Sequence, residues 1–573
     1  MRFSSLRFAC AMTAFCAIFA PFLANAQNLI TIDLSYVDQQ SEAFTRFKNW
    51  VDQAVGGDPD YGFSATDAAY MGKLTGQPQY CALAVQMADQ QVSDAEAAIA
   101  GGTAPAVAYD SYLYSGGMIS DLALTYDWCY GQVSSSQRTR WATYANQAVF
   151  NIWNFAQAQW GGQAAPWSGW GTDDPGNNYH FSFLEATMYW AIASDSVSVW
   201  QPYLENVKLP LVEQYYAALP GGGSEEGTGY GVSQRNLFAL YRMWFDCVGT
   251  DLGNASSHMS DTIAYWVHAT VPTMDQFAPI GDQSRSSVPW LYDYHRDLVL
   301  EARAQSDDAA MRDLASWWLN SISVDHMSSA FNYRDDLLPA GTNTTPPAEL
   351  SYHAQGVGVM FARTGWDSGA TWLSFIAGPY TQSHAHQEQG AFTLFGGGNW
   401  LAVTENIWSH SGIQADTTTN NVVRFVNDGE TIRQTQPSTS DMTFTSNADG
   451  SVQASGDLTP AFGGDPNISS WQRSLDFTGG QLTVTDNFSV SSGTQAIFQV
   501  NVPVRPVISG NTATAGALHI TVLEPAGATL SAVDWTTVDG DYSSGWRIDV
   551  TGSGSQFVVK LGITDDIFAG GFE

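Results

Sequence analysis

Lysine is almost absent from this sequence, which has only four lysines among its 573 residues. Acidic residues outnumber lysine and arginine by 56 to 22, so the formal net charge is −34 at pH 7. A surface of this charge repels the phosphates of nucleic acids and the head groups of anionic lipids at long range. The composition therefore excludes nucleic acid as an expected partner, and it disfavours a densely sulfated polymer as a substrate.

Long apolar runs are also absent after the N-terminus, where no segment reaches the ~18 uninterrupted apolar residues of a membrane span. At the start of the chain, Arg2 and Arg7 precede an apolar run over Ala9–Leu23, and residues 24–26 have the small-x-small pattern of a cleavage site. These three parts predict a secretory signal over residues 1–26. We expect a secreted or periplasmic mature chain that begins near Gln27 and does not contact a membrane.

Cysteine is scarce as well. Of the five cysteines, Cys10 and Cys16 lie in the predicted signal, which leaves Cys81, Cys129 and Cys247 in the mature chain. Three cysteines allow one disulfide at most, and export permits such a bridge. The alternative is that all three are small buried apolar residues. Their spacing excludes a cysteine-based zinc knuckle.

Aromatic residues are abundant at 13%, with 21 Trp, and they provide both core material and flat faces that stack on sugar rings. From about residue 40 to 330, apolar residues recur at three- and four-residue spacing, which predicts helices. Gly, Pro and Ser/Asp clusters separate these segments, as in helical hairpins. We expect an (α/α) toroid, or incomplete barrel, over residues 27–336, with an irregular helical bundle as the alternative.

The apolar period changes to two after the segment "LLPAGTNTTPPAEL", residues 337–350, which is typical of a linker. Short stretches such as "ATWLSFIAG", "QLTVTDNFSV" and "SQFVVKLGI" follow, separated by Gly, Asn, Asp and Ser turns. They predict an antiparallel β-sandwich over residues 351–573, with a frayed tail at 565–573. The expected fold class is α+β, a helical domain followed by a β-domain.

The stretch "WSGWGTDDPGNNYHFSF", residues 167–183, is the first of three that have chemically useful residues. A loop with two Trp and two Asp runs into a predicted helix. Asn177 or Asn178 is a good helix cap, and either amide is also able to hydrogen-bond a carboxylate. Trp170 and His180 are further candidates for contacts with a substrate.

The second stretch is "LPGGGSEEGTGYGVSQRN", residues 219–236, in which glycines surround Glu225, Glu226 and Tyr230. Glycine allows close backbone approach and unusual dihedrals. Tyr230 is therefore expected either to protrude into a cleft or to pack on the rim of the helical domain. Arg235 follows in the next predicted helix, and Arg285 occurs in "GDQSRSS"; both are candidates for binding a carboxylate through a guanidinium fork.

The third stretch is "YTQSHAHQEQGAFTLF", residues 380–395. If it is a strand, His384 and His386 point to the same face because side chains alternate. Such a pair can bind a metal, divide its roles between metal and substrate, or be two surface residues. Glu405 and His410 follow and are candidates to complete a site.

The order of these stretches, together with "WQRSLDFTGGQLTVTDNF", resembles the heparinase II/III type of polysaccharide lyase, which includes uronate lyases. The resemblance implies a toroid followed by a β-domain, and cleavage of an acidic polysaccharide or oligosaccharide by β-elimination. It implies that Asn178, or alternatively Asn177, meets the uronate carboxylate and that Tyr230 is the catalytic acid. It further implies that His384 faces the substrate and that His386 binds a structural metal, usually zinc.

Two positions depart from the pattern of that family. Its metal-binding Asp falls here at Thr404 or Glu405, and its later metal-binding His falls at Asn420. The divalent metal site is therefore either lost or rebuilt from His386, Glu405 and His410. We expect His384 to contact the substrate or Tyr230, and His386 to be more buried, with either a metal or a hydrogen bond to Glu405.

The residues suit an elimination that removes the C5 proton next to a uronate carboxylate. Asn178, helped by His180 or an arginine, would neutralise the carboxylate, and either Tyr230 or His384 would take the proton. Two other functions remain open at this stage. A toroidal glycoside hydrolase would use paired carboxylates among Asp173, Asp174, Glu225 and Glu226, and a secreted carbohydrate-binding protein would have no catalytic group.

Overall fold

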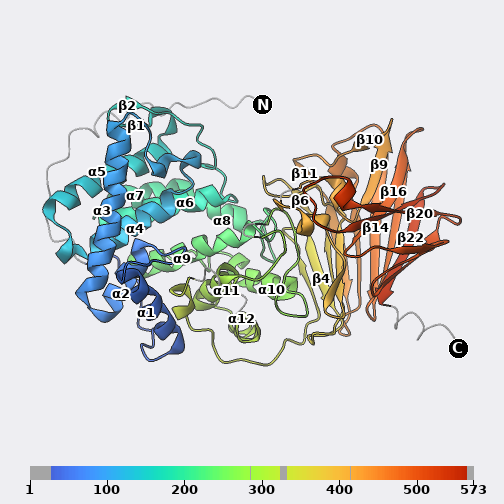
Figure 1. Ribbon diagram of the computed structural model, residues 1–573, viewed down its shortest axis with the longest axis horizontal. Helices are drawn as coiled ribbons and strands as arrows, with labels where there is room; N and C mark the ends of the chain where they lie inside the picture. Colours follow the sequence, from blue (N-terminus) through green and yellow to red (C-terminus); the bar gives the residue numbers. More distant parts are fainter. Residues whose placement is uncertain (1–27, 284–285, 323–331, 413, 564–573) are drawn as a thin grey trace.

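The computed structural model describes residues 28–283, 286–322, 332–412 and 414–563. The predicted signal, Arg285 and the tail at 565–573 lie outside the described residues. Figure 1 shows a helical half formed by the N-terminal part of the chain and, beside it, a half made of stacked sheets. The last helical turn before the change is η8 (Asp335–Leu337), and the first strand of the second half begins at Ser351. The α+β fold class and the order of its two parts are as predicted.

Several helices of the helical half begin at residues with capping side chains. Ser41 accepts a hydrogen bond from the backbone N–H of Phe44, and Ser134 forms a capping box with Gln137. Gly249, at φ 86°, ends a helix in the left-handed conformation that glycine favours. The helices are α1 (Glu42–Val55), α2 (Ala65–Thr75), α3 (Pro78–Ala100), α4 (Ser115–Trp128), α5 (Ser135–Trp153), α6 (Asn178–Ala193), α7 (Val197–Tyr203), α8 (Leu209–Ala217), α9 (Gln234–Val248), α10 (His258–Ala269), α11 (Asp293–Gln305) and α12 (Ala309–Ser321).

Helix α6 is the centre of this half, because residues on most of its faces are buried. It packs on α4 through a close approach at Gly116, whose backbone N–H donates to Ser182 Oγ at 2.7 Å. A Cβ at Gly116 would lie 2.9 Å from the Cα of Ser182, so glycine permits this contact. Closure of the helix pairs into an incomplete toroid stays a prediction. In the part of the chain that the structure describes, no helix combines the length and the apolar character needed to cross a membrane.

One disulfide joins α3 to the end of α4. It pairs Cys81 with Cys129, while Cys247 on α9 is a free, partly buried thiol. The structure thus selects one of the pairings that the sequence left open.

Cys81→Ser is expected to lower the free energy of unfolding by about 2–4 kcal/mol, because it releases a long loop in the unfolded chain. The bridged residues are 48 positions apart. Denaturant unfolding with and without a reducing agent measures the effect, and Cys247→Ser is the matched control. An unchanged unfolding midpoint in Cys81→Ser would contradict the bridge.

In its described residues, the second half has three large antiparallel sheets and one small ribbon. The sheet next to the helices has the order β3 (Ser351–Ala354), β4 (Val359–Arg363), β5 (Trp372–Ile376), β7 (Phe392–Gly396), β8 (Asn399–Ala402). A second has the order β10 (Glu430–Ile432), β9 (Val423–Asn427), β16 (Gln495–Val502), β21 (Trp546–Thr551), β20 (Thr529–Asp534). The third has the order β12 (Asp441–Ser446), β13 (Val452–Asp457), β14 (Ile468–Thr478), β15 (Gln481–Val490), β22 (Gln556–Ile563), β19 (Leu518–Glu524), β18 (Thr512–Ala515), β17 (Val507–Ser509). The small ribbon pairs β6 (Pro379–Tyr380) with β11 (Ser438–Thr439). A second ribbon, β1 (Gln159–Trp160) with β2 (Gln163–Ala164), lies in the helical half between α5 and α6.

Buried and exposed residues alternate along β14 and β15, as expected for strands with one face on the core. A single apolar cluster joins the three large sheets and includes Leu373, Phe498 and Val484, one from each of them. This shared core explains why the sheets stack.

The two halves share a buried contact. Arg363 on β4 has no exposed surface, and its guanidinium donates to the backbone carbonyls of His268 and Thr270 in the helical half. The indole N–H of Trp372 also donates to the His268 carbonyl, at 2.9 Å. These bonds fix the β-half against α10, so loops from both halves meet in a defined position.

Candidate active site

Tyr230 and His384 meet at the boundary between the two halves. Tyr230 follows the glycine-rich loop after α8, and His384 belongs to the loop between β6 and β7. Their rings are stacked, with centroids 3.6 Å apart and planes 10° apart. The imidazole remains 22% exposed, so the pair is accessible to a ligand. The contact with Tyr230 is one of the two that the sequence led us to expect for His384.

The prediction that His384 and His386 lie on one face of a strand is wrong. The neighbouring strand, β7, begins only at Phe392. The backbone of the histidine segment instead bonds to other loops: the N–H of Asp282 donates to the His384 carbonyl at 2.9 Å, and the N–H of Gln387 donates to Ala415. Because these partners come from loops, the segment has no strand ladder, and its side chains need not alternate.

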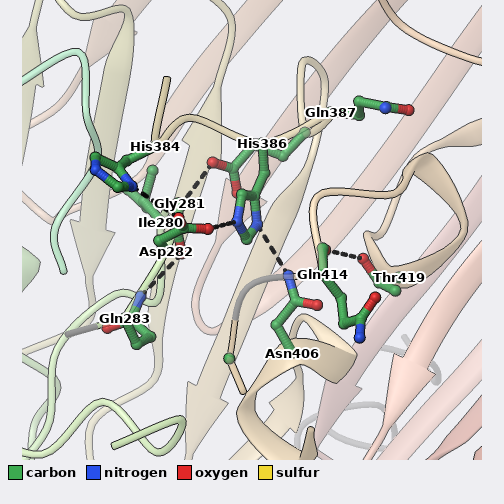
Figure 2. Close-up of polar contacts among 12 residues, drawn as sticks. Ile280, Gly281, Asp282, Gln283, His384, His386, Gln387, Asn406, Gln414 and Thr419 are labelled. Carbon is green, nitrogen blue, oxygen red and sulfur yellow. Dashed lines mark hydrogen bonds and ion pairs between the residues drawn. The ribbon is translucent and has the colours of Figure 1, made fainter. Parts of the chain in front are cut away.

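Asp282 links the two histidines, and the sequence did not identify it. One carboxylate oxygen lies 2.8 Å from His384 Nδ1, and the other bonds His386 Nε2 (Figure 2). Burial raises the pKa of Asp282, but the hydrogen bonds of the two imidazoles outweigh it and lower that pKa. The group is therefore an anion. The sequence signal that could have identified Asp282 is its position in "IGDQSRSS", three residues before the candidate Arg285.

A glycine beside Asp282 lets three segments approach one another. Gly281 has φ 67°, and a Cβ there would lie 2.7 Å from the His384 carbonyl oxygen and 2.8 Å from that of Glu226. A larger residue would push these segments apart. Gly281 thus allows the Tyr230 loop and the His384 loop to meet at Asp282.

The anionic partner fixes the chemistry of His384. Because a carboxylate only accepts hydrogen bonds, His384 Nδ1 carries the proton that faces Asp282. In the neutral ring, Nε2 is then an acceptor that is free to take a proton. Burial and the charge of Asp282 also raise the pKa of Tyr230, which keeps its phenol protonated. The pair therefore combines a proton acceptor with a proton donor.

His386 is held by hydrogen bonds at both ring nitrogens. It is only 1% exposed; Nε2 faces Asp282, and Nδ1 accepts from the amide of Asn406 at 2.9 Å (Figure 2). The expected bond to Glu405 is replaced by this bond to Asn406. His386 therefore anchors the loop through both of its ring nitrogens.

The predicted metal ligands do not form a site. His410 is exposed, and neither carboxyl oxygen of the buried Glu405 has a hydrogen-bond partner among the described residues. Over residues 28–563 with their three gaps, no group of three His, Cys, Asp or Glu side chains has the arrangement that holds a metal ion. The structure does not bring His386, Glu405 and His410 together as three ligands, and a divalent metal bound at His386 stays a prediction.

The two asparagines have different environments. Asn177 is the N-cap of α6, and its side chain accepts from the backbone N–H of Tyr179 at 3.0 Å. Asn178 is the first residue of the helix and is partly exposed. His180 has no exposed surface, and its Nδ1 lies 3.0 Å from the carbonyl of Gly171. The burial of the His180 ring does not fit the prediction that it contacts a substrate. Asn178 is exposed enough to make such a contact.

The other predicted binding residues lie in different environments. Trp170 is 49% exposed and offers a flat face. The guanidinium of Arg235 lies 3.3 Å from Asp297 and lines a polar cavity of about 190 Å³ within the helical half, together with Glu185 and Glu301. Arg235 is thus already paired with a carboxylate of the chain. Arg285 lies outside the described residues.

Three of the four carboxylates that a hydrolase would use are engaged in other contacts, and the fourth is buried. Asp173 pairs with Lys208 at 2.7 Å, and Glu225 accepts hydrogen bonds from the hydroxyls of Tyr215 and Thr381. Asp174 accepts from the Gln382 amide, and Glu226 is completely buried. A hydrolase needs two carboxyl groups that flank the scissile bond, and this arrangement does not favour that mechanism.

No family model matches the sequence, and no curated protein matches it. Solved structures do match. Heparan sulfate lyase HepC from Pedobacter heparinus has 14% identity and a TM-score of 0.56, covering 93% of this chain and 85% of its own. A heparinase III structure has 11% identity and a TM-score of 0.58, with coverages of 94% and 86%. The Streptomyces coelicolor A3 chondroitin AC lyase, in complex with chondroitin sulphate, has 10% identity and a TM-score of 0.54, with coverages of 92% and 80%. The chain therefore has the fold of heparinase-like polysaccharide lyases.

Proposed function

We propose that this protein is a secreted polysaccharide lyase that cleaves a uronic-acid-containing polysaccharide by β-elimination. The observation that carries the proposal is the stacked Tyr230–His384 pair, with His384 oriented by the Asp282 carboxylate. The fold shared with heparinase III and chondroitin AC lyase supports it. The acidic composition favours a polymer with little or no sulfate, because like charges repel at long range.

The reaction breaks the C5–H and C4–O4 bonds of the uronate and forms a double bond between C4 and C5. The C5 proton is weakly acidic because the resulting negative charge develops next to a carboxylate. A hydrogen bond from the Asn178 amide to that carboxylate stabilises the charge as an enediolate. Donors aimed at developing charge are typically the largest catalytic contribution.

His384 is the base and Tyr230 the acid in this scheme. His384 Nε2 takes the C5 proton, and the resulting imidazolium is stabilised by Asp282. The Tyr230 hydroxyl gives its proton to O4 as the bond to C4 breaks. Because the pKa of Tyr230 is raised, first by burial, the phenol is a poor candidate for the base and a suitable donor.

The stacking also suggests which uronates react. Two rings only 3.6 Å apart approach the sugar from one side. The C5–H and C4–O4 bonds must then lie on the same side of the ring, as in glucuronate and mannuronate. Iduronate and guluronate have these bonds on opposite sides, and we expect them to be poor substrates.

Asn178→Ala is expected to lower kcat about 10²-fold with little change in KM, because carboxylate neutralisation matters most as charge builds in the transition state. Steady-state kinetics on a cleaved polymer measure both constants. A raised KM at unchanged kcat would instead mean that Asn178 only holds the substrate.

Product chemistry tests the proposed activity. A lyase leaves an unsaturated sugar that absorbs ultraviolet light, a hydrolase leaves a new reducing end without that absorbance, and a binding protein leaves the polymer intact. The purified mature chain is therefore incubated with glucuronate-, mannuronate-, iduronate- and guluronate-containing polymers while absorbance is followed. Reducing ends without absorbance would contradict the proposal.

A further inference from the structure

Glu226 is a buried carboxyl group next to the catalytic pair, four residues before Tyr230. It has no exposed surface, and in the described part of the chain neither of its oxygens has a hydrogen-bond partner. The loop around it is tightly packed, since a Cβ at Gly227 would lie 2.2 Å from the Ile280 carbonyl oxygen. A buried carboxylate without a partner is costly, so this group calls for an explanation.

The side chain of Asn178 also has an unpaired buried oxygen, since Oδ1 has no partner among the described residues. The two residues are neighbours, because the backbone N–H of Asn178 lies near enough to the Glu226 carboxyl to favour its ionised form. An amide oxygen and an ionised carboxylate both only accept hydrogen bonds, whereas a protonated carboxyl group is a donor. One proton on Glu226 would therefore satisfy both groups.

The surroundings of Glu226 favour the protonated form. Burial, followed by the charges of Asp174 and Asp282, raises the pKa of Glu226 to about 8, against an opposing effect of the Asn178 N–H. The phenols of Tyr216 and Tyr230 also face this carboxyl group. Among the described residues whose charges act on Glu226, two are acidic and none is a lysine, arginine or histidine, so only the Asn178 N–H favours the anion.

We propose that neutral Glu226 is a positioning residue that donates a hydrogen bond to Asn178 Oδ1. This bond fixes the amide so that its NH₂ group, and not its oxygen, faces the uronate carboxylate. Without it, the amide is free to rotate by a half turn and present an oxygen to the anion. The catalytic consequence of this inference rests on the proposed lyase activity. The protonation state of Glu226 does not depend on that activity.

Two substitutions separate this role from a structural one. Glu226→Gln keeps a donor and cannot ionise, so it should keep the kcat of the unaltered protein at pH 7. It should also remain active above pH 8, where the unaltered protein loses activity as Glu226 ionises. Glu226→Ala removes the donor and should lower kcat about 10²-fold with KM nearly unchanged. Glu225→Gln is the matched control in the same loop and should leave the upper pH limit in place.

Other kinetic outcomes would overturn the proposal. If Glu226→Gln is as impaired as Glu226→Ala, the carboxyl group itself takes part in proton transfer. If Glu226→Ala has the kcat and pH profile of the unaltered protein, the group has no role in positioning Asn178.

Thermal unfolding tests the protonation state without any substrate. Because the folded-state pKa of about 8 lies above the ordinary value of 4.5, the unfolded chain loses this proton first as pH rises. Glu226 therefore makes the folded state progressively less stable between these two values. Glu226→Gln should have the Tm of the unaltered protein near pH 4.5 and a higher Tm near pH 8. Equal pH dependence in both proteins would overturn the inference even if the lyase activity is real, whereas absent activity with the expected Tm difference would count against the proposed function alone.

Discussion

Tyr230→Phe is expected to abolish measurable turnover while the fold and the affinity for the polymer are retained. The substitution removes one hydroxyl and keeps the ring that stacks on His384 at 3.6 Å. Loss of a general acid costs about 10²–10⁴-fold in rate, and among the described residues no other phenol is stacked on the base. Initial rates, calorimetric binding of the polymer and melting curves of both proteins measure the three quantities.

Tyr215→Phe is the control for this variant. It removes a hydroxyl that donates to Glu225 at 3.0 Å and not to His384, and should leave most of the activity. Near-normal rates in Tyr230→Phe, or an equal loss in both variants, would exclude Tyr230 as the acid.

Asp282→Ala is expected to reduce both activity and stability, because one carboxylate serves both histidines. Its loss leaves His384 without the group that sets its tautomer, and we expect a rate reduction of about 10²-fold or more. It also leaves the buried His386 without one of its two partners, and a broken buried network of this kind typically costs about 3 kcal/mol. Kinetics and denaturant unfolding of the variant measure the two effects.

Single histidine variants separate the two roles of Asp282. His384→Ala should lower activity with little change in Tm, and His386→Ala should lower Tm, since only the second ring is buried. Equal losses of activity and equal Tm values in the two variants would contradict this division. Elemental analysis of protein purified without a chelator provides a second check, because stoichiometric zinc would contradict the hydrogen-bonded role of His386.

The pH dependence of stability provides a further test of Asp282. Its pKa is lowered in the folded state despite burial, because the two imidazoles bond the anion. Its contribution is therefore present above the ordinary carboxyl value of 3.8 and is lost as pH falls through the folded-state value. In Asp282→Ala, the free energy of unfolding should therefore depend less on pH in this acid range.

Local sequence signals predicted the parts of the site that depend on neighbouring residues. Glycines on both sides of Tyr230 indicated an unusual loop, and the Asn-Asn pair before an apolar helical pattern indicated a cap together with a second, available amide. The capping role of Asn177 is visible in the spacing, since its side chain bonds the backbone two residues later. Helices and strands were likewise predictable, because their apolar periods are local.

The parts of the site that could not be predicted depend on contacts between residues far apart in the sequence. Asp282 precedes His384 and His386 by 102 and 104 positions, so no spacing rule connects them. The histidine segment has strand-like alternation, but a strand needs a ladder partner, and its backbone bonds to loops instead. The partners of His386 are also set by long-range contacts, since it takes them from Asp282 and Asn406 and not from Glu405.

Ultraviolet absorbance of the products is the measurement that tests the central claim most directly. The mature chain and its Tyr230→Phe variant are incubated with an unsulfated glucuronate polymer, and absorbance and reducing ends are counted together. The account predicts one unsaturated end for each new reducing end with the unaltered protein, and neither product with the variant. Reducing ends without absorbance, or absorbance that persists in the variant, would contradict an elimination carried out by Tyr230 and His384.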